Sequence, residues 1–333
     1  MKSFEYHVGG QPVRVIVEGV PAPQGRTQPQ KAAWFARHAD RCRRGLVLAP
    51  RGHADMNAVL LTEPSSAEAH AGLVFLDASG YPRFALPAIV AAATAAVEHN
   101  LVSAGTAEGR ALVFDTPAGV VSALVSPPAA PPGSVLVRGV PAFVYAAGLP
   151  VTLPSRTIPV DIAFDGEFLA LVDGEAAGVP LDVEHVPELR RLARAICTAL
   201  SRTTTVVHPL DPTIDGVAGV VFSGPARDPE VHLRTVLVTA AGAVDWSPGA
   251  SATAAVMAVL DAIGLVTEAP SFTHEGLSGA QVTGRLVSRG LVDQHPSLVV
   301  EVAARAWPTG EQAWILDHDD PFHQGLTAAP ADR

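Results

Sequence analysis

The sequence predicts an α+β fold, because short runs rich in β-branched residues alternate with a few longer helical segments. We expect strands at residues 13–17, 72–76, 111–114, 135–137 and 168–172. We expect helices at residues 30–43, 87–100, 187–200 and 251–263, separated by turns that contain Gly and Pro. A chain of 333 residues is long enough for about two domains of ordinary size.

Two of the expected helices are apolar on every face, at residues 86–97 and 251–263. Such helices are buried in globular proteins, so we expect both to lie in cores. Pro87 fits the first turn of its helix, where its fixed φ is suitable and its missing N–H is not needed.

Composition and charge exclude several classes of partner. The chain has 48% hydrophobic residues, but Pro or Gly interrupts each apolar stretch before the roughly 20 residues of a membrane span. The first residues lack the apolar segment of a secretory signal, so we expect a cytoplasmic protein. The net charge of −10 argues against binding nucleic acid. The preference for Arg over Lys indicates a GC-rich bacterial genome.

No metal or organic cofactor is expected. Cys42 and Cys197 are the only cysteines, and neither has the spacing of a metal ligand or a redox motif. The chain also lacks a Gly-rich phosphate loop and a dinucleotide fingerprint in a convincing context.

Several motifs occur in the same order as in a known family. They are Gly9-Gly10-Gln11-Pro12 with Gly19-Val20-Pro21, Pro50-Arg51-Gly52-His53-Ala54-Asp55-Met56, Asp161-Ile162-Ala163-Phe164 with Gly166, Asp211-Pro212 with Gly216-Val217, Asp245-Trp246-Ser247-Pro248, Thr283-Gly284-Arg285, and Asp319-Asp320-Pro321-Phe322. On these residues the chain resembles the proline racemase family, which includes 4-hydroxyproline epimerases and trans-3-hydroxyproline dehydratases.

The resemblance implies the architecture of diaminopimelate epimerase-like proteins. These have two similar lobes, each a curved β-sheet around a central helix, with the ligand cleft between the lobes. We expect the first lobe at residues 1–155 plus about 306–333 and the second at 156–305. A homodimer remains open as the assembly.

The resemblance also implies a chemistry that this chain lacks. Family members use two thiols, each at a helix start, to remove and return the α-proton of a proline-like amino acid. The matched runs here are Ala85-Leu86-Pro87-Ala88 and Gly249-Ala250-Ser251-Ala252, so Ala85 and Gly249 stand in the cysteine positions. A methyl group and a hydrogen move no proton, and two-thiol racemisation is not expected.

Ligand binding is altered as well. In the family, the N–H groups at both helix starts hold the substrate carboxylate. Leu86 replaces a glycine and Pro87 has no N–H, whereas Ala250 and Ser251 still have N–H groups to offer. The matched Asp245, which contacts the substrate amine in the family, is retained. Leu86, Asp245, Ala250 and Ser251 are therefore the candidate ligand-binding residues.

Few candidates for a surviving base remain. Asp245 and His53 are the two that we name, although a structural role in their turn is favoured for His53 and Asp55. Ser251 is close to the second emptied position, and we expect it to cap the following helix.

Three functions stay open. The first is a one-base isomerase or lyase that acts on a proline- or pyrroline-like small molecule. The second is a catalytically dead protein that still binds such a molecule. The third is a partner subunit whose ligand cleft is filled by Leu86 and Trp246.

Overall fold

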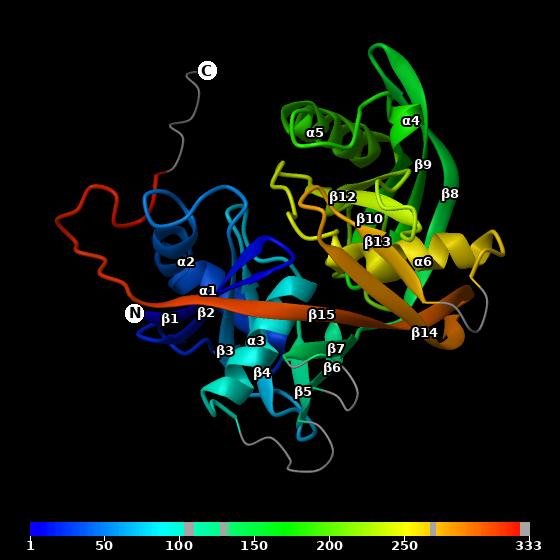
Figure 1. Cartoon of the computed structure of the whole chain (residues 1–333). Coiled ribbons are helices and arrows are strands. Elements are labelled where there is room, and N and C mark those ends of the chain that lie inside the picture. Colours follow the sequence, from blue (N-terminus) through cyan, green and yellow to red (C-terminus); the bar gives the residue numbers. More distant parts are fainter. Residues whose placement is uncertain (103–109, 127–130, 132, 267–270, 327–333) are drawn as a thin grey trace. The chain divides into compact units, whose positions relative to one another are not determined.

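The chain folds into two compact units, each with strands around a helix (Figure 1). The structure, a computed structural model, describes residues 1–326 except 103–109, 127–130, 132 and 267–270. Residues Met1–Val135 and Arg305–Arg333 form the first unit, and Leu136–Ala304 form the second. The mixture of helices and strands in both units confirms the predicted α+β class.

The unit boundary differs from the expected one. The sequence placed it at 155/156, in the turn between β8 (Ala142–Leu153) and β9 (Arg156–Phe164). These two strands pair along their length as an antiparallel hairpin. The pairing keeps both strands in the second unit.

The first unit contains the strands β1-β2-β3-β4-β5-β6 in this order and the start of β7, which crosses the unit boundary, and the last part of β15 pairs with β1. The pairs β2–β3 and β4–β5 are parallel, and helices provide both crossovers. The strands are β1 (Lys2–Val8), β2 (Gln11–Glu18), β3 (Asn57–Thr62), β4 (Ala71–Leu76), β5 (Arg110–Thr116), β6 (Gly119–Val125), β7 (Ser134–Arg138) and β15 (His295–Ala313).

Helix α3 (Leu86–Glu98) is the central helix of the first unit and contacts β1, β2, β3 and β6. Its residues 86–96 are buried on all faces, which confirms the prediction of a core helix. The alanines on this helix allow strands to approach it from several sides.

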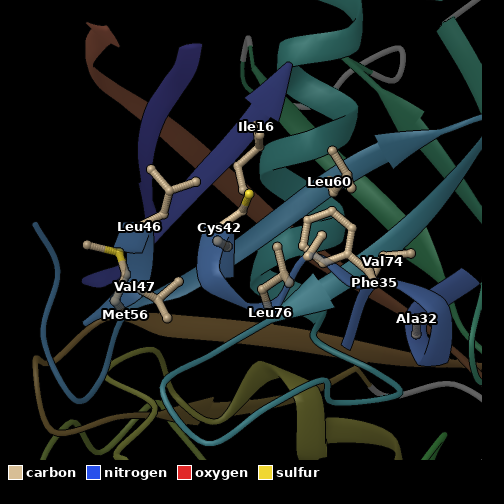
Figure 2. Close-up of a cluster of buried hydrophobic side chains, with 12 residues drawn as sticks. Ile16, Ala32, Phe35, Cys42, Leu46, Val47, Met56, Leu60, Val74 and Leu76 are labelled. Carbon is tan, nitrogen blue, oxygen red and sulfur yellow. The ribbon is translucent and has the colours of Figure 1, made fainter. Parts of the chain in front are cut away.

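The predicted helix at residues 30–43 is two helices, α1 (Gln28–His38) and α2 (Asp40–Val47). The break is at Ala39, whose φ of −135° is not helical. Both helices bury apolar side chains against the sheet, where Phe35, Cys42 and Leu46 pack with residues of β2, β3 and β4 (Figure 2).

Cys42 and Cys197 are buried free thiols, and burial raises the pKa of both.

The second unit contains a sheet in the order β15-β14-β13-β12-β11-β10-β9-β8, and β8 pairs again with β15. Helix α6 (Thr253–Ala262) contacts β8, β9 and β14, and α5 (Val186–Thr203) contacts β8, β11 and β12. The other elements are β10 (Phe168–Asp173), α4 (Gly174–Ala177), β11 (Gly219–Gly224), β12 (Leu233–Thr239), η1 (Ala250–Ala252), β13 (Phe272–Glu275) and β14 (Gln281–Val292).

All five predicted strands are present, in β2, β4, β5, β7 and β10.

Two motifs that are distant in the sequence meet in the first unit, because Arg51 donates to the Asp320 carboxylate at 2.6 Å and to the carbonyl of Phe322. Within the described residues, every helix is too short or too polar to cross a membrane.

Candidate functional site

Ala85 and Gly249 lie where a helix begins, as the sequence predicted. Ala85 is the N-cap of α3 and has an extended backbone, and its carbonyl accepts the N–H of Ile89 at 3.0 Å. Gly249 is the N-cap of η1, a single 3₁₀ turn that leads directly into α6. Neither residue offers an ionisable group to these helix starts.

The start of α3 has fewer donors than an ordinary helix start. Leu86 is its first residue and is only 2% exposed, and Pro87 follows as the second. The N-cap residue, Ala85, has no side-chain atom that could cap this end. Because proline has no N–H, one of the amides that would face an anion is missing.

In the second unit, Asp245 is connected to Ala250 through Ser247. The Oδ1 atom of Asp245 accepts from the Ser247 N–H at 2.9 Å and from its hydroxyl at 2.6 Å. The Ser247 Oγ in turn accepts from the Ala250 N–H at 3.2 Å. The Ala250 amide, expected to hold a ligand carboxylate, is therefore engaged with a side chain of the protein.

Asp245 has one bound carboxylate oxygen and one open oxygen. Its Oδ2 accepts no hydrogen bond from any described residue, and this oxygen is not completely shielded from solvent. Burial raises the pKa of Asp245 to about 6, and the hydrogen bonds from Ser247 offset this only in part. A carboxyl with a pKa near neutrality can accept and return a proton.

The N-terminus of α6 is capped by a carboxyl from a distant turn. The Ala255 N–H donates to Oδ2 of Asp165 at 3.2 Å, and the Ala254 amide also contributes. Burial raises the pKa of Asp165 well above its usual range despite these bonds. Our expectation that Ser251 caps this helix is wrong, because the N-cap position belongs to Ala252 and Ser251 lies in the preceding 3₁₀ turn.

A buried histidine supports the segment around Gly249. His274 is 0% exposed, and its Nδ1 lies 2.6 Å from Thr235 Oγ1 and its Nε2 lies 2.9 Å from Thr253 Oγ1. Thr235 Oγ1 also lies within hydrogen-bond distance of the carbonyl of Pro248, and Thr253 Oγ1 lies 3.0 Å from the carbonyl of Ala250. The two carbonyls flank Gly249, so the network holds this residue from both sides.

Hydrogen-bond counting selects one tautomer of His274. Burial lowers the pKa of His274 to about 3, so the ring is neutral at pH 7 and one ring nitrogen must accept. The threonine beside that nitrogen must then turn its single hydroxyl proton to the ring and release its carbonyl. The Ala250 carbonyl can lose the hydroxyl of Thr253, because it still accepts a hydrogen bond from the Thr253 N–H. The favoured tautomer of His274 therefore carries its proton on Nδ1, and Nε2 accepts from the Thr253 hydroxyl.

We expect ¹⁵N NMR at pH 7 to show His274 as the neutral Nδ1–H tautomer, and the ring to stay neutral down to about pH 4 because its pKa is about 3. Thr253→Val removes the donor to Nε2 and should move the Nε2 resonance strongly and Nδ1 little. An Nε2–H tautomer, or a protonated ring at pH 6, would contradict this hydrogen-bond assignment.

The remaining candidates are distributed over both units. Ala85, Leu86 and His53 belong to the first unit, whereas Asp245, Ala250 and Ser251 belong to the second. His53 is exposed, and its Nδ1 accepts from the Asp55 N–H at 3.2 Å, an arrangement that stabilises their turn. Among the described residues, no three His, Cys, Asp or Glu side chains are grouped to hold a metal ion.

Sequence reasoning missed three residues of this arrangement. Ser247 lies inside a matched motif and was not given a role, Asp165 directly follows another, and Thr235 carries no recognisable local signal. The contacts of Thr235 and His274 come from neighbouring strands, which a local pattern does not reveal.

Comparisons with known proteins agree on one family. The family model described as proline racemase matches residues 4–327. A trans-3-hydroxy-L-proline dehydratase of Bacillus cereus is 31% identical over 324 residues, which are 97% of this chain and 97% of the relative. A 3-hydroxyproline 2-epimerase of Burkholderia multivorans is 33% identical over 327 residues, with 98% and 97% covered.

A solved structure of a hydroxyproline epimerase has a similar fold. The hydroxyproline epimerase of Agrobacterium vitis, crystallised with bound trans-4-hydroxy-L-proline, superposes with a TM-score of 0.90 at 26% identity. The match covers 98% of this chain and 94% of that one.

Proposed function

This chain belongs to the proline racemase family, and we propose that it binds a proline- or pyrroline-like small molecule and moves a proton with one base, Asp245. The observation that carries the proposal is the state of that carboxyl. It is buried, one oxygen is held by Ser247, the other is open, and its pKa is about 6.

One base is sufficient for a double-bond shift. The Asp245 carboxylate would take a proton from a carbon next to the double bond or carbonyl of the ligand. The resulting acid would return the proton to another carbon of the same conjugated system, so the double bond moves and nothing is consumed. In an elimination, the same acid would protonate a departing hydroxyl group and release water.

The ligand that we propose depends less on its carboxylate than proline does. The α3 start lacks the Pro87 amide, and the Ala250 and Ala255 amides are held by Ser247 and Asp165. A buried aspartate instead favours a ligand with an amine or imine nitrogen, whose positive charge compensates the carboxylate.

We expect the protein in D₂O to exchange a ring or α-proton of L-proline, a hydroxyproline isomer or a pyrroline carboxylate, with loss of the corresponding ¹H NMR signal. At low ligand concentration, where most of the protein is free, the rate should rise with pH through about 6, as Asp245 of the free protein loses its proton. Asp245→Asn, which keeps an oxygen to accept both Ser247 bonds, should lower exchange by at least about 100-fold, the usual contribution of a general base.

The stability of the same variant provides a control on folding. A carboxyl whose pKa is raised in the folded state destabilises the protein as pH rises through that pKa. Asp245→Asn should therefore unfold at a higher temperature than the natural protein at pH 8, and at about the same temperature at pH 4. Loss of exchange with loss of folding would remove the support for Asp245 as the base.

A second candidate is a binding protein without catalysis. It is favoured by Ala85 and Gly249, which place no proton-transferring side chain at either helix start. Broadening of ligand signals without deuterium exchange would support this function. Neither broadening nor exchange would favour the partner-subunit function.

A further inference from the structure

A pocket of about 620 Å³ lies in the second unit, where β10 and β11 end. These strands pair in parallel, and the carboxyl ends of parallel strands are a common place for ligands. Gly174 and Gly224 stand at the two strand ends and line the pocket with backbone, and Val179 and Leu181 contribute apolar side chains.

The polar wall of the pocket is Arg234, which is only 4% exposed. Its Nε donates to Oε1 of Glu275 at 3.0 Å, and its Nη1 donates to the carbonyl of Leu181 at 2.9 Å. Glu275 is itself fixed by the N–H of Arg227 at 2.6 Å. The guanidinium is therefore held rigidly on two of its three nitrogens.

The third nitrogen is unused. Nη2 of Arg234 has no hydrogen-bond partner among the described residues. This nitrogen is not completely shielded from solvent, so a ligand can reach it. A buried, fixed guanidinium with open N–H groups suits a carboxylate oxygen, which it binds through charge-assisted hydrogen bonds. Arg227 also lines the pocket, and its exposed side chain has no partner in the described part of the chain.

The pocket also has acidic groups. Asp182 is committed to His185, from which it accepts two hydrogen bonds of 3.0 and 2.6 Å. Glu175 has no ion-pair partner among the described residues. The pocket thus combines open donors for an anion, an open carboxylate for a cation and an apolar surface.

We propose that this pocket binds an α-amino acid with an apolar side chain. Arg234 and Arg227 would hold the carboxylate, Glu175 would attract the ammonium group, and the side chain would lie on Val179 and Leu181. Both charges of the ligand then meet an opposite charge, which a simple carboxylate or a simple amine does not achieve. The site contains neither Asp245 nor a helix start discussed above, so it is independent of the proposed function.

Methyl NMR of the full-length protein tests the proposal with three matched probes. L-Leucine has both charges, 4-methylpentanoate lacks the amine, and 3-methylbutylamine lacks the carboxylate. We expect L-leucine to shift the methyl signals of Leu181 and Val179 saturably and to leave those of Leu260 unchanged. Each truncated probe should bind at least about tenfold more weakly, because one charged hydrogen bond is lost.

Two exposed substitutions locate the charges without risk to the core. Arg227→Gln should weaken L-leucine and 4-methylpentanoate alike, whereas Glu175→Gln should weaken L-leucine and leave 4-methylpentanoate unchanged. Arg202→Gln and Glu230→Gln, at exposed positions outside the pocket, are the matched controls. The proposal is overturned if L-leucine produces no saturable shift at Leu181, or if all three probes bind equally.

Discussion

The Ala85→Cys/Gly249→Cys variant is expected to show little racemase activity on proline, although it has a thiol at both positions where the family resemblance leads us to expect one. Activity is measured as change of optical rotation and as α-deuterium exchange in D₂O. The expected result follows from the backbone around the two positions.

At the first position, the carboxylate site that the resemblance leads us to expect would lack one donor. Pro87 offers no N–H, and the loss of one such donor typically lowers a rate by about 100- to 1,000-fold. The side chain of Leu86 is buried beside it and is only 2% exposed.

At the second position, the backbone conformation of Gly249 disfavours a cysteine. Gly249 has φ 73° and ψ 44°, in the left-handed region, where a residue with a Cβ costs roughly 1–2 kcal/mol. Space is not the obstacle, because a Cβ there would meet Leu237 Cβ at 3.4 Å and Thr235 Oγ1 at 3.9 Å. A thiol is therefore accommodated only with strain or with a shifted turn.

The variant Ala85→Cys/Leu86→Gly/Pro87→His/Gly249→Cys separates these causes. It removes the Leu86 side chain and gives position 87 an N–H, and it should exceed the double variant by about 100-fold if the missing amide dominates. Robust activity in the double variant alone would show that the α3 start still binds a carboxylate.

Replacing Arg234 by methionine is expected to lower the free energy of unfolding by about 3–5 kcal/mol, because it leaves the Glu275 charge buried without its partner. Both side chains are only 4% exposed, and their atoms Nε and Oε1 lie 3.0 Å apart. Urea unfolding with comparison of m-values measures the loss.

Two further variants make this result specific. Arg234→Met/Glu275→Gln removes the stranded charge and should recover most of the lost stability, since glutamine can still accept the Arg227 N–H. Arg289→Met breaks an ion pair whose side chains are 41% and 25% exposed and should cost below about 1 kcal/mol. Equal losses for Arg234→Met and Arg289→Met would contradict a special role of burial.

Sequence reasoning was most accurate for the central helix of the first unit. Residues 86–97 are apolar on all faces, and this pattern alone predicts burial, because no face can be solvated favourably. The structure confirms the burial of α3. For residues 251–263 the same prediction is only partly correct, because α6 is buried in its first half against the strands, whereas Ile263 after its end is 65% exposed.

Helix ends were predicted less well, since distant residues decide them. The helix predicted at 30–43 breaks at Ala39, next to Asp40, which binds Arg43 while Arg43 also donates to the carbonyls of Asp77 and Ala78. The α6 start is set by Asp165, far away in the chain, in place of the expected Ser251.

By itself, the sequence determined the family, the α+β class, and the absence of an ionisable side chain at residues 85 and 249, since these depend only on residue identities and their order. Only the tertiary structure decided the chemical state of the groups that remain. The pKa of Asp245, the neutral ring of His274 and the open nitrogen of Arg234 depend on burial and on hydrogen bonds. Burial and hydrogen bonding arise when strands distant in the sequence pack together, which is why no local pattern encodes them.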